Sequence, residues 1–216
     1  MAWNTQDANN AAIPEFGLDG GLAGILTRNT NHSDFTENRF SGSFRGIELD
    51  FSNNNRVRRN RVEGNAEDGI SLYGSSDNVV QWNVVTGNFG GMWMQTVERF
   101  EGGLETNRNL ISSNNLSENR AYGIAMNGVV NDNLVLNNTL TGSSDFGVLL
   151  LGVAPEGTPV PAGNTLRGNT AYGHLVTDLA ELDLDENYEP VIPSECSNTW
   201  KHNTFGTSFG PEGCIE

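Results

Sequence analysis

Two carboxylates spaced two residues apart are the first candidates for chemistry in this sequence. Glu48 and Asp50 follow Gly46 in a segment where apolar and polar residues alternate. In a strand this spacing places both side chains on one face, with Cα atoms about 7 Å apart. A pair of carboxyl groups at such a separation can serve as acid and base in glycoside cleavage. We therefore take Glu48 and Asp50 as candidate catalytic residues.

The same carboxylates suit a second kind of chemistry. Either could join a Ca²⁺ site that neutralises the carboxylate of a uronic acid, because Ca²⁺ binds oxygen ligands. Tyr73, Arg28 or Arg45 would then accept or donate the proton in a β-elimination. The plain alternative is that these are solvated side chains on the surface of a sheet. His and Cys form no cluster with metal-ligand spacing.

Aromatic, amide and charged residues occupy equivalent positions in neighbouring segments. Sugar rings stack on aromatic faces, and their hydroxyl groups bond carboxylates and amides. The sequence therefore predicts a polysaccharide groove. Tyr73 is the third catalytic candidate beside Glu48 and Asp50, and the candidate substrate-binding residues are Arg28, Arg45, Asp68, Trp93 and Gln95.

An internal repeat carries these residues. Its signature is Asn, any residue, an apolar residue, two residues, then Asn, any residue and an apolar residue again. Successive copies are 22, 23, 31, 24, 31 and 34 residues apart, with the central Asn at positions 38, 60, 83, 114, 138, 169 and 203. A unit of about 22 residues therefore recurs seven times. The longer steps predict insertions at 96–107, 152–163 and 176–197, either as surface loops or as the walls of a cleft.

The repeat predicts three short strands per turn. One is the Gly-apolar-x-apolar segment at 46–49, 69–72, 91–94, 123–126 and 147–150, whose period of two indicates a strand with one buried face. The Asn motif supplies two more strands separated by corners, where Asn and Gly tolerate a left-handed backbone. We predict an all-β, right-handed parallel β-helix of about seven coils with ladders of stacked Asn. A leucine-rich repeat does not fit, because the required Leu pattern and helix are missing.

Composition excludes several classes of protein. Asn and Gly number 29 and 26 of the 216 residues, which is incompatible with a helical bundle. The formal charge of −15 argues against nucleic acid or an anionic membrane as partner. No apolar stretch approaches the roughly 18 residues of a membrane span.

The C-terminal stretch has the most specific pattern in the chain. Its characteristic residues are Asp183, Asp185, Asn187, Cys196, Asn198, Trp200, Asn203, Phe205, Gly206, Thr207, Cys214 and Ile215. The sequence from about residue 23 to 216 resembles the secreted right-handed β-helix repeat proteins, the pectate-lyase-like superfamily that includes polysaccharide lyases, epimerases and glycosidases. The resemblance implies a β-helix and weighs toward polysaccharide chemistry. It transfers no catalytic residue, because the signatures of polygalacturonases, alginate epimerases and pectate lyases are absent.

The two ends of the chain carry further expectations. Cys196 and Cys214 flank the last coil, so we predict a disulfide there rather than two free thiols. An extracellular or periplasmic location follows, with a signal peptide outside the printed sequence. Residues 1–22 are expected to form an irregular segment or partial coil preceding the β-helix of 23–216. The open N-terminal end would be capped by further coils or by another subunit.

Other residues have simpler interpretations. Glu37, Arg59 and Trp82 are expected to stack outward as an ion pair followed by a cation–π contact. His174 takes an Asn-ladder position and is expected to be a corner residue. The acidic residues at 178–186 are expected in a solvated loop rather than a Ca²⁺ site. Three methionines suggest copper delivery or, with their inward register, core packing: Met92, Met94 and Met126.

Three functional hypotheses follow. The first is an extracellular β-helix protein that binds polysaccharide and processes it as a lyase, epimerase or glycosidase. The second is a non-catalytic carbohydrate-binding or scaffold module, part of a longer surface protein. Copper delivery is a distant third.

Overall fold

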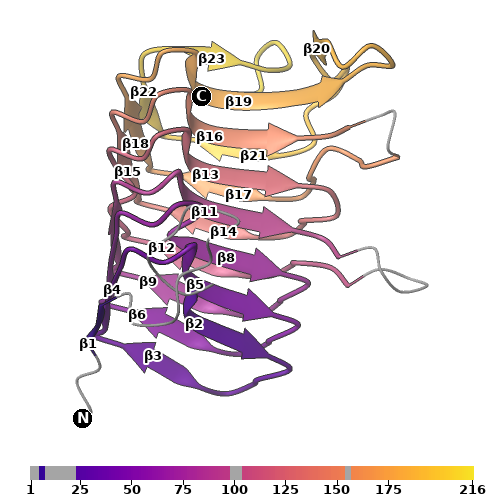
Figure 1. The fold of residues 1–216 in the computed structure, drawn as a ribbon. Helices are drawn as coiled ribbons and strands as arrows, with labels where there is room; N and C mark the ends of the chain where they lie inside the picture. The colour runs from indigo at the N-terminus through magenta and orange to yellow at the C-terminus, as the bar shows by residue number, and fades with distance from the viewer. Residues whose placement is uncertain (1–4, 8–22, 98–103, 154–156) are drawn as a thin grey trace.

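The computed structural model describes residues 5–7, 23–97, 104–153 and 157–216. Figure 1 shows short strands stacked in successive turns from the N-terminal to the C-terminal end. The strands pair in parallel from one coil to the next, and the chain folds as the predicted right-handed parallel β-helix. Within those ranges no helix is long and apolar enough to span a membrane.

The Gly-apolar segments form one parallel sheet, which we call the front sheet. Its register aligns the predicted outward columns, since Glu48 pairs with Ser71 and Ser71 with Trp93. Two short strands, β20 (Pro190–Val191) and β23 (Ser208–Phe209), pair with the last long strand. The long strands are β2 (Ala23–Arg28), β5 (Arg45–Asp50), β8 (Ile70–Tyr73), β11 (Gly90–Gln95), β13 (Tyr122–Asn127), β16 (Phe146–Leu151) and β19 (Thr177–Leu184).

The Asn motif forms the other two sides of each coil. One side is a seven-stranded sheet of β3 (Asp34–Thr36), β6 (Arg56–Arg58), β9 (Val79–Gln81), β12 (Leu110–Ser112), β14 (Leu134–Leu136), β17 (Thr165–Arg167) and β21 (Thr199–Lys201). The other side has two parts, which Asn115 bridges through Val84 and Thr139. They are β1 (Thr5–Asp7), β4 (Arg39–Ser41), β7 (Arg61–Glu63) and β10 (Val84–Thr86), then β15 (Thr139–Thr141), β18 (Thr170–Tyr172) and β22 (Thr204–Phe205).

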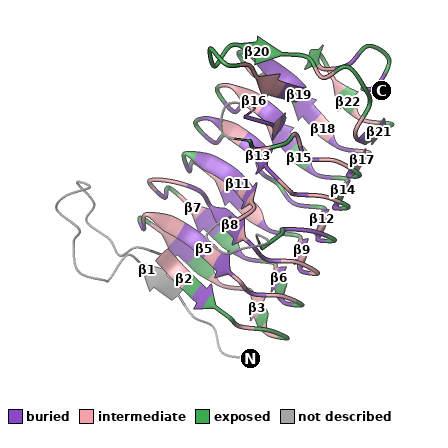
Figure 2. Cartoon of the chain, turned by 90° about the vertical axis from the view of Figure 1, so that its right-hand side faces the viewer, coloured by how far each residue is buried: buried purple, intermediate pink, exposed green. Residues whose placement is uncertain are grey.

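A continuous apolar interior runs along the helix. Figure 2 shows buried residues along the strands and exposed ones mainly at the corners and near the ends. Ile47, Ile70 and Ile124 stack inward and have no exposed surface. Met92 and Met94 also have none, which confirms core packing as their role.

Ladders of buried Asn hold the corners together, as the repeat predicted. The Asn114 amide group donates to Oδ1 of Asn138 and to the carbonyl of Val80, both at 3.0 Å. Its own Oδ1 accepts from the backbone and side-chain amides of Asn83, both at 2.9 Å. Since each ladder Asn bonds the coils on both sides, it satisfies polar groups that the coil would otherwise leave unpaired.

The left-handed residue of one corner is the one that precedes the ladder Asn. In three coils it is Glu37, Arg59 or Trp82, with φ of 59°, 55° and 57°. The expectation that Asn and Gly supply this conformation is wrong there, because the Asn is needed for the ladder. The outward stack itself is confirmed. Arg59 lies 3.8 Å from the Glu37 carboxylate, and its guanidinium lies 5.3 Å from the Trp82 ring centroid.

Residues 177–184 correct another expectation, because they form β19 and not a solvated loop. Asp178 takes the position that glycine occupies in the earlier coils, and Glu181 takes an inward, fully buried position. Asp178 Oδ2 accepts from the amides of Gly206 and Thr207, and its Oδ1 lies 2.7 Å from His174 Nδ1. These bonds, which outweigh the effect of burial, hold the pKa of Asp178 below its usual value. Because polar residues occupy core positions here, the apolar pattern of the sequence did not predict this strand.

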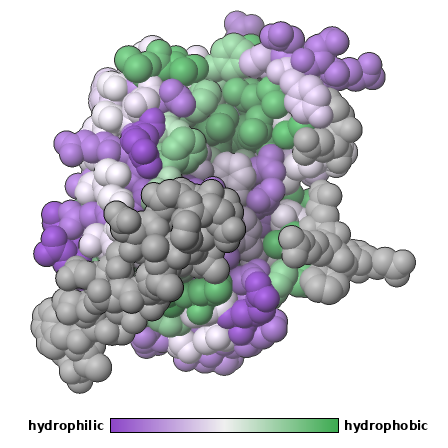
Figure 3. All heavy atoms as spheres, viewed as in Figure 1, coloured by the Kyte–Doolittle hydropathy of each residue, from purple (hydrophilic) through white to green (hydrophobic). Residues whose placement is uncertain are grey.

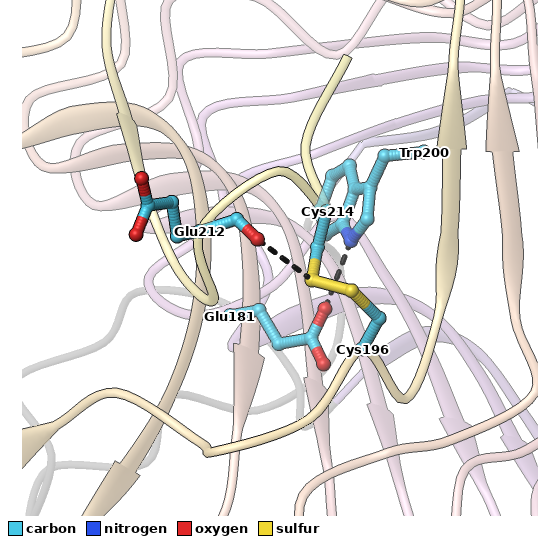
Figure 4. The surroundings of a disulfide bond; sticks show 5 residues. All are labelled: Glu181, Cys196, Trp200, Glu212 and Cys214. Carbon is cyan, nitrogen blue, oxygen red and sulfur yellow. Dashed lines mark hydrogen bonds between the residues drawn. A yellow bond between two sulfur atoms is a disulfide. The ribbon is translucent and has the colours of Figure 1, made fainter.

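The predicted disulfide joins Cys196 and Cys214, whose Cα atoms are 5.5 Å apart. Figure 4 shows it beside Trp200 and Glu181. Trp200 is buried and donates from Nε1 to Glu181 Oε2 at 2.9 Å. A covalent link and a buried hydrogen bond thus close the C-terminal end of the interior.

The insertions at 96–107 and 152–163 leave the front sheet where β11 and β16 end (Figure 1). Each starts with an antiparallel bridge, Val97 to Leu104 and Val153 to Thr158. A Cβ added to Gly74 would lie 2.8 Å from that of Leu104, so the first insertion packs back on the turn after β8. Walls around a cleft remain a prediction. Most of the expected irregular segment at 1–22 lies outside the described residues.

Candidate functional site

The predicted site residues lie on the outward face of the front sheet. Residue pairing places Arg28, Asp50, Tyr73 and Gln95 in one column across four coils. Glu48 and Trp93 belong to the adjacent column, with Ser71 between them. The alternation of the strands therefore brings these side chains to a common face. A further column carries Arg45 and Asp68.

Arg45 is the central cation of the face. Its Nη1 lies 3.1 Å from Glu48 Oε2, and its Nη2 lies 2.7 Å from Glu67 Oε2. The guanidinium carbon is 5.2 Å from the Phe44 ring centroid and 5.3 Å from that of Tyr73. Because two carboxylates and two rings surround it, Arg45 is held in one orientation.

Arg28 forms the second ion pair. Its Nε donates to Asp50 Oδ2 at 2.8 Å. Asp50 is buried beneath it, whereas the Arg28 side chain is mostly exposed. Both predicted catalytic carboxylates, Glu48 and Asp50, are therefore bound to arginine within the chain.

Asp68 has a different kind of partner. Tyr122 donates from its hydroxyl to Asp68 Oδ1 at 2.7 Å, and Ser71 Oγ lies 3.5 Å from Oδ2. Gly90 lies between Asp68 and Tyr122, in the coil that separates them. A Cβ there would lie 2.3 Å from the Tyr122 ring and 2.4 Å from Asp68 Oδ1. Glycine is thus required for Tyr122 to reach Asp68.

Burial shifts the ionisation of this group of side chains. It raises the pKa of Asp68 to about 6, although the hydrogen bond from Tyr122 opposes the rise. Burial also raises the pKa of Tyr73 to about 12, against the opposing charge of Arg45. The pKa of Tyr122 is raised by burial and by the Asp68 carboxylate. Asp68 therefore changes protonation near neutral pH, whereas both tyrosines keep their protons.

Trp93 borders the Asp68–Tyr122 pair. Its ring centroid is 5.7 Å from that of Tyr122, and the rings are tilted by 42°. Its Nε1 donates to Gln95 Oε1 at 3.0 Å, and Gln95 Nε2 donates to Asn127 Oδ1 at 3.3 Å. These bonds fix the orientation of the indole.

The structure extends the predicted set. Glu67 pairs with Arg45, and Tyr122 bonds Asp68. The sequence pattern places Tyr122 on this face but assigns it no role, and it does not point to Glu67. Glu67 comes just before the segment with the strand pattern. The role of Tyr122 depends on Gly90, which has no side chain to separate Tyr122 from Asp68. The sequence signal that could have revealed the pair is a glycine in an outward column between a Tyr and an Asp.

The calcium hypothesis finds little support in the geometry. In the part of the chain that the structure describes, no three His, Cys, Asp or Glu side chains converge on a point. Arginine already neutralises both Glu48 and Asp50. The arrangement therefore does not fit a preformed Ca²⁺ site.

The face turns apolar in the later coils. Figure 3, viewed as in Figure 1, shows hydrophobic surface in the upper part of the molecule. Leu149 and Leu182 pack with Ala125 and Ala180 on the outer side of the sheet, next to Trp93 and Tyr122. The polar chemistry is therefore confined to the strands from β2 to β13.

Comparison with known proteins decides the family. Residues 8–171 match the family described as "Right handed beta helix region". The chain belongs to this family. No curated protein matches it.

Two solved structures share the fold of this β-helix protein. One is the periplasmic alginate epimerase AlgG, with a TM-score of 0.62 and 18% identity over 87% of this chain. This chain spans 43% of the epimerase. The other is an alginate lyase from Paenibacillus sp. str. FPU-7, with a TM-score of 0.58 and 14% identity over 91% of this chain and 80% of that one. At such identities the likeness shows the fold alone.

Proposed function

We propose that this protein binds a polysaccharide on the outward face of the front sheet and processes it by elimination, epimerisation or hydrolysis. The observation that carries the proposal is the buried Asp68 carboxyl group, which has a pKa of about 6 and a bound tyrosine hydroxyl. A group that titrates near neutral pH can both accept and donate a proton, as acid–base catalysis requires. Trp93 and Tyr122 beside it offer aromatic surface to a sugar ring.

The substrate class is proposed to be a polysaccharide that contains uronic acid. Residues 28–61 carry seven Arg against four acidic residues, a formal charge of +3 in a chain of −15. Of the seven, Arg28 and Arg45 lie on the front sheet, where they can attract a carboxylate-bearing sugar. The two structural neighbours are alginate enzymes, which supports the same class.

Within this proposal each group has a role. Tyr73, with a pKa of about 12, keeps its proton at neutral pH and serves as proton donor. Asp68 is only 4% exposed, so it exchanges its proton through the Tyr122 hydroxyl. Glu48 and Asp50 stay candidate catalytic groups, and in the free protein they orient Arg45 and Arg28 toward the substrate carboxylates.

The test is a panel of uronate and neutral polysaccharides. Products are followed by the absorbance of unsaturated uronates, by reducing ends and by NMR of epimerised residues. Asp68→Asn should lower turnover by at least about 100-fold if Asp68 transfers the proton. Asp77→Asn is the matched control, because Asp77 bonds the exposed Arg108 away from the face. If the wild-type protein forms no product from any polysaccharide of the panel, the catalytic proposal is wrong.

One observation favours a second candidate, a non-catalytic carbohydrate-binding module. Glu48, Asp50 and Asp68 all have a partner within the chain, as in a surface built for recognition. Binding without product, weakened by Trp93→Ala, would support this candidate. Turnover of any polysaccharide in the panel would exclude it.

We also propose an extracellular or periplasmic location. The disulfide Cys196–Cys214 supports it, because such bonds persist in oxidising compartments. Fractionation of the cells that make the natural protein tests this, and recovery in the cytosol with reduced thiols would contradict it.

A further inference from the structure

Three aromatic rings form a continuous row across the front sheet. The Phe89 and Tyr122 centroids are 6.2 Å apart with the rings nearly perpendicular, and Tyr122 is 5.7 Å from Trp93. Phe89 comes just before β11, and Trp93 lies within it. Tyr122 belongs to the next strand but leans over Gly90. All three rings are therefore at the level of one strand, β11.

Phe89 is the most exposed ring of the row. Its ring is in the corner that leads into β11, where backbone bonds align Phe89 with Glu67 and Ala121. Phe89 is 45% exposed, whereas Ala121 above it is buried. The Phe89 ring therefore offers apolar surface that a ligand from solution can cover.

Arg120 holds the exposed ring in place. Its guanidinium carbon lies 5.9 Å from the Phe89 centroid, and its Nη2 donates to the carbonyl of Ala66 at 3.2 Å. Tyr122 is held in the same manner by Asp68, and Trp93 by Gln95. Each ring of the row is thus fixed by a polar neighbour, which lowers the entropy cost of binding a ligand on it.

We propose that Phe89, Tyr122 and Trp93 form one sugar-stacking platform along β11. A polysaccharide would then cross the front sheet parallel to its strands and not along the axis of the helix. From Phe89 to Gln95 the path is about 20 Å long, since a strand rises about 3.3 Å per residue. Phe89 and Arg120 form the subsite at one end, and Gln95 lies at the other.

This inference rests on the proposed function and adds a direction to it. The path passes beside Arg45 and Tyr73, which lie on the coils toward the N-terminus, so the sugar over Tyr122 is the one that faces the acid–base groups. The apolar later coils are not needed for binding. Oligosaccharides should therefore gain affinity with length only until they reach from Gln95 to Phe89.

The experiment is calorimetric titration with alginate oligosaccharides, from disaccharide to octasaccharide. Phe89→Ala should weaken binding of the longer oligosaccharides by about 3- to 10-fold and leave the disaccharide unaffected. Phe89→Leu keeps most of the apolar volume but removes the ring face, so it should show the same loss of affinity. This variant replaces Phe89→Ala in the experiment if the alanine variant fails to fold. Trp82→Ala is the control, because Trp82 stacks on Arg59 at a different corner.

Leu26 tests the direction of the path. It is 50% exposed and lies in the same outward column as Trp93, three coils away. Leu26→Ala should leave octasaccharide affinity unchanged, and a loss would indicate a path along the helix axis and overturn the platform. If Trp93→Ala abolishes binding while Phe89→Ala and Phe89→Leu bind like the wild type, the platform is wrong and the proposed function stands. If the wild-type protein binds no oligosaccharide, the proposed function and the platform both fail.

Discussion

The hydroxyl of Tyr122 bonds the carboxyl group of Asp68 at 2.7 Å although a whole coil separates the two residues. The contact exists because Gly90 presents no side chain in the column between them. It joins a buried group that titrates near neutral pH to an aromatic ring on the proposed binding face.

Removing the Tyr122 hydroxyl should raise the pKa of Asp68 above its value of about 6, because the hydrogen bond stabilises the ionised form. For Tyr122→Phe we expect a rise of about one to two units. Carbon NMR titration of the Asp carboxyl groups measures it. Tyr172→Phe is the control, since Tyr172 lies on β18 and is exposed. An unchanged pKa would mean that the hydroxyl contributes nothing to the ionisation of Asp68.

The raised pKa of Asp68 also predicts how stability depends on pH. The folded protein holds this proton up to about pH 6, whereas the ordinary value is 3.8. The folded state therefore binds more protons in that window, and the contribution of Asp68 to stability falls as pH rises. The fall amounts to at most about 3 kcal/mol and is complete above pH 6.

Urea unfolding of the wild type and of Asp68→Asn between pH 4 and 7 tests this sign. The wild type should lose stability relative to the variant across the window. A difference that stays constant with pH would contradict the raised pKa.

Asn114→Ala should destabilise the protein strongly. The change removes four hydrogen bonds to Asn83, Asn138 and Val80 and leaves their buried groups unpaired. We expect a loss of about 3 kcal/mol or more in the free energy of unfolding, measured by urea titration. Asn31→Ala is the matched control. Asn31 is exposed and accepts one hydrogen bond from the Asn53 amide, so its loss should cost less than about 1 kcal/mol.

Reduction of the disulfide between Cys196 and Cys214 should destabilise the C-terminal coil by about 3 kcal/mol, from the entropy of an 18-residue loop. Hydrogen exchange should show faster opening around β21 and β19, with the coils near β5 unchanged. Uniform faster exchange along the chain would indicate instead that the bond stabilises the whole helix.

Chelation of divalent cations should leave both stability and polysaccharide binding unchanged. The reason is that arginine neutralises Glu48 and Asp50. Thermal unfolding and binding with EGTA, then with Ca²⁺ restored, measure this. Loss of binding that Ca²⁺ restores would show that the ion enters with the substrate.

The period of the Asn residues was sufficient to predict the coils, the ladders and the outward columns. This worked because each ladder Asn and each inward apolar residue performs the same task in successive coils. The strand at 177–184 was not predicted, because Asp178 replaces the glycine and Glu181 replaces an apolar core residue. Their partners, Gly206 and Trp200, are more than ten residues away in sequence.

The site was predicted less completely than the fold. The columns placed Arg28 beside Asp50 and Glu48 near Arg45, but alternation alone does not say which charges pair. The pKa of Asp68 depends on how deeply it is buried, and the role of Tyr122 depends on a contact that passes over one coil. Neither follows from the spacing of residues along the chain.

Contacts that pass over a coil also change how this solenoid should unfold. In a simple repeat array each unit interacts only with its immediate neighbours, so coils can open one after another from either end. Arg120 and Tyr122 both extend from one coil across the next to bond the coil beyond it, at Ala66 and Asp68. These bonds couple the three coils, so we expect fraying that starts at the N-terminal end to slow when it reaches β8.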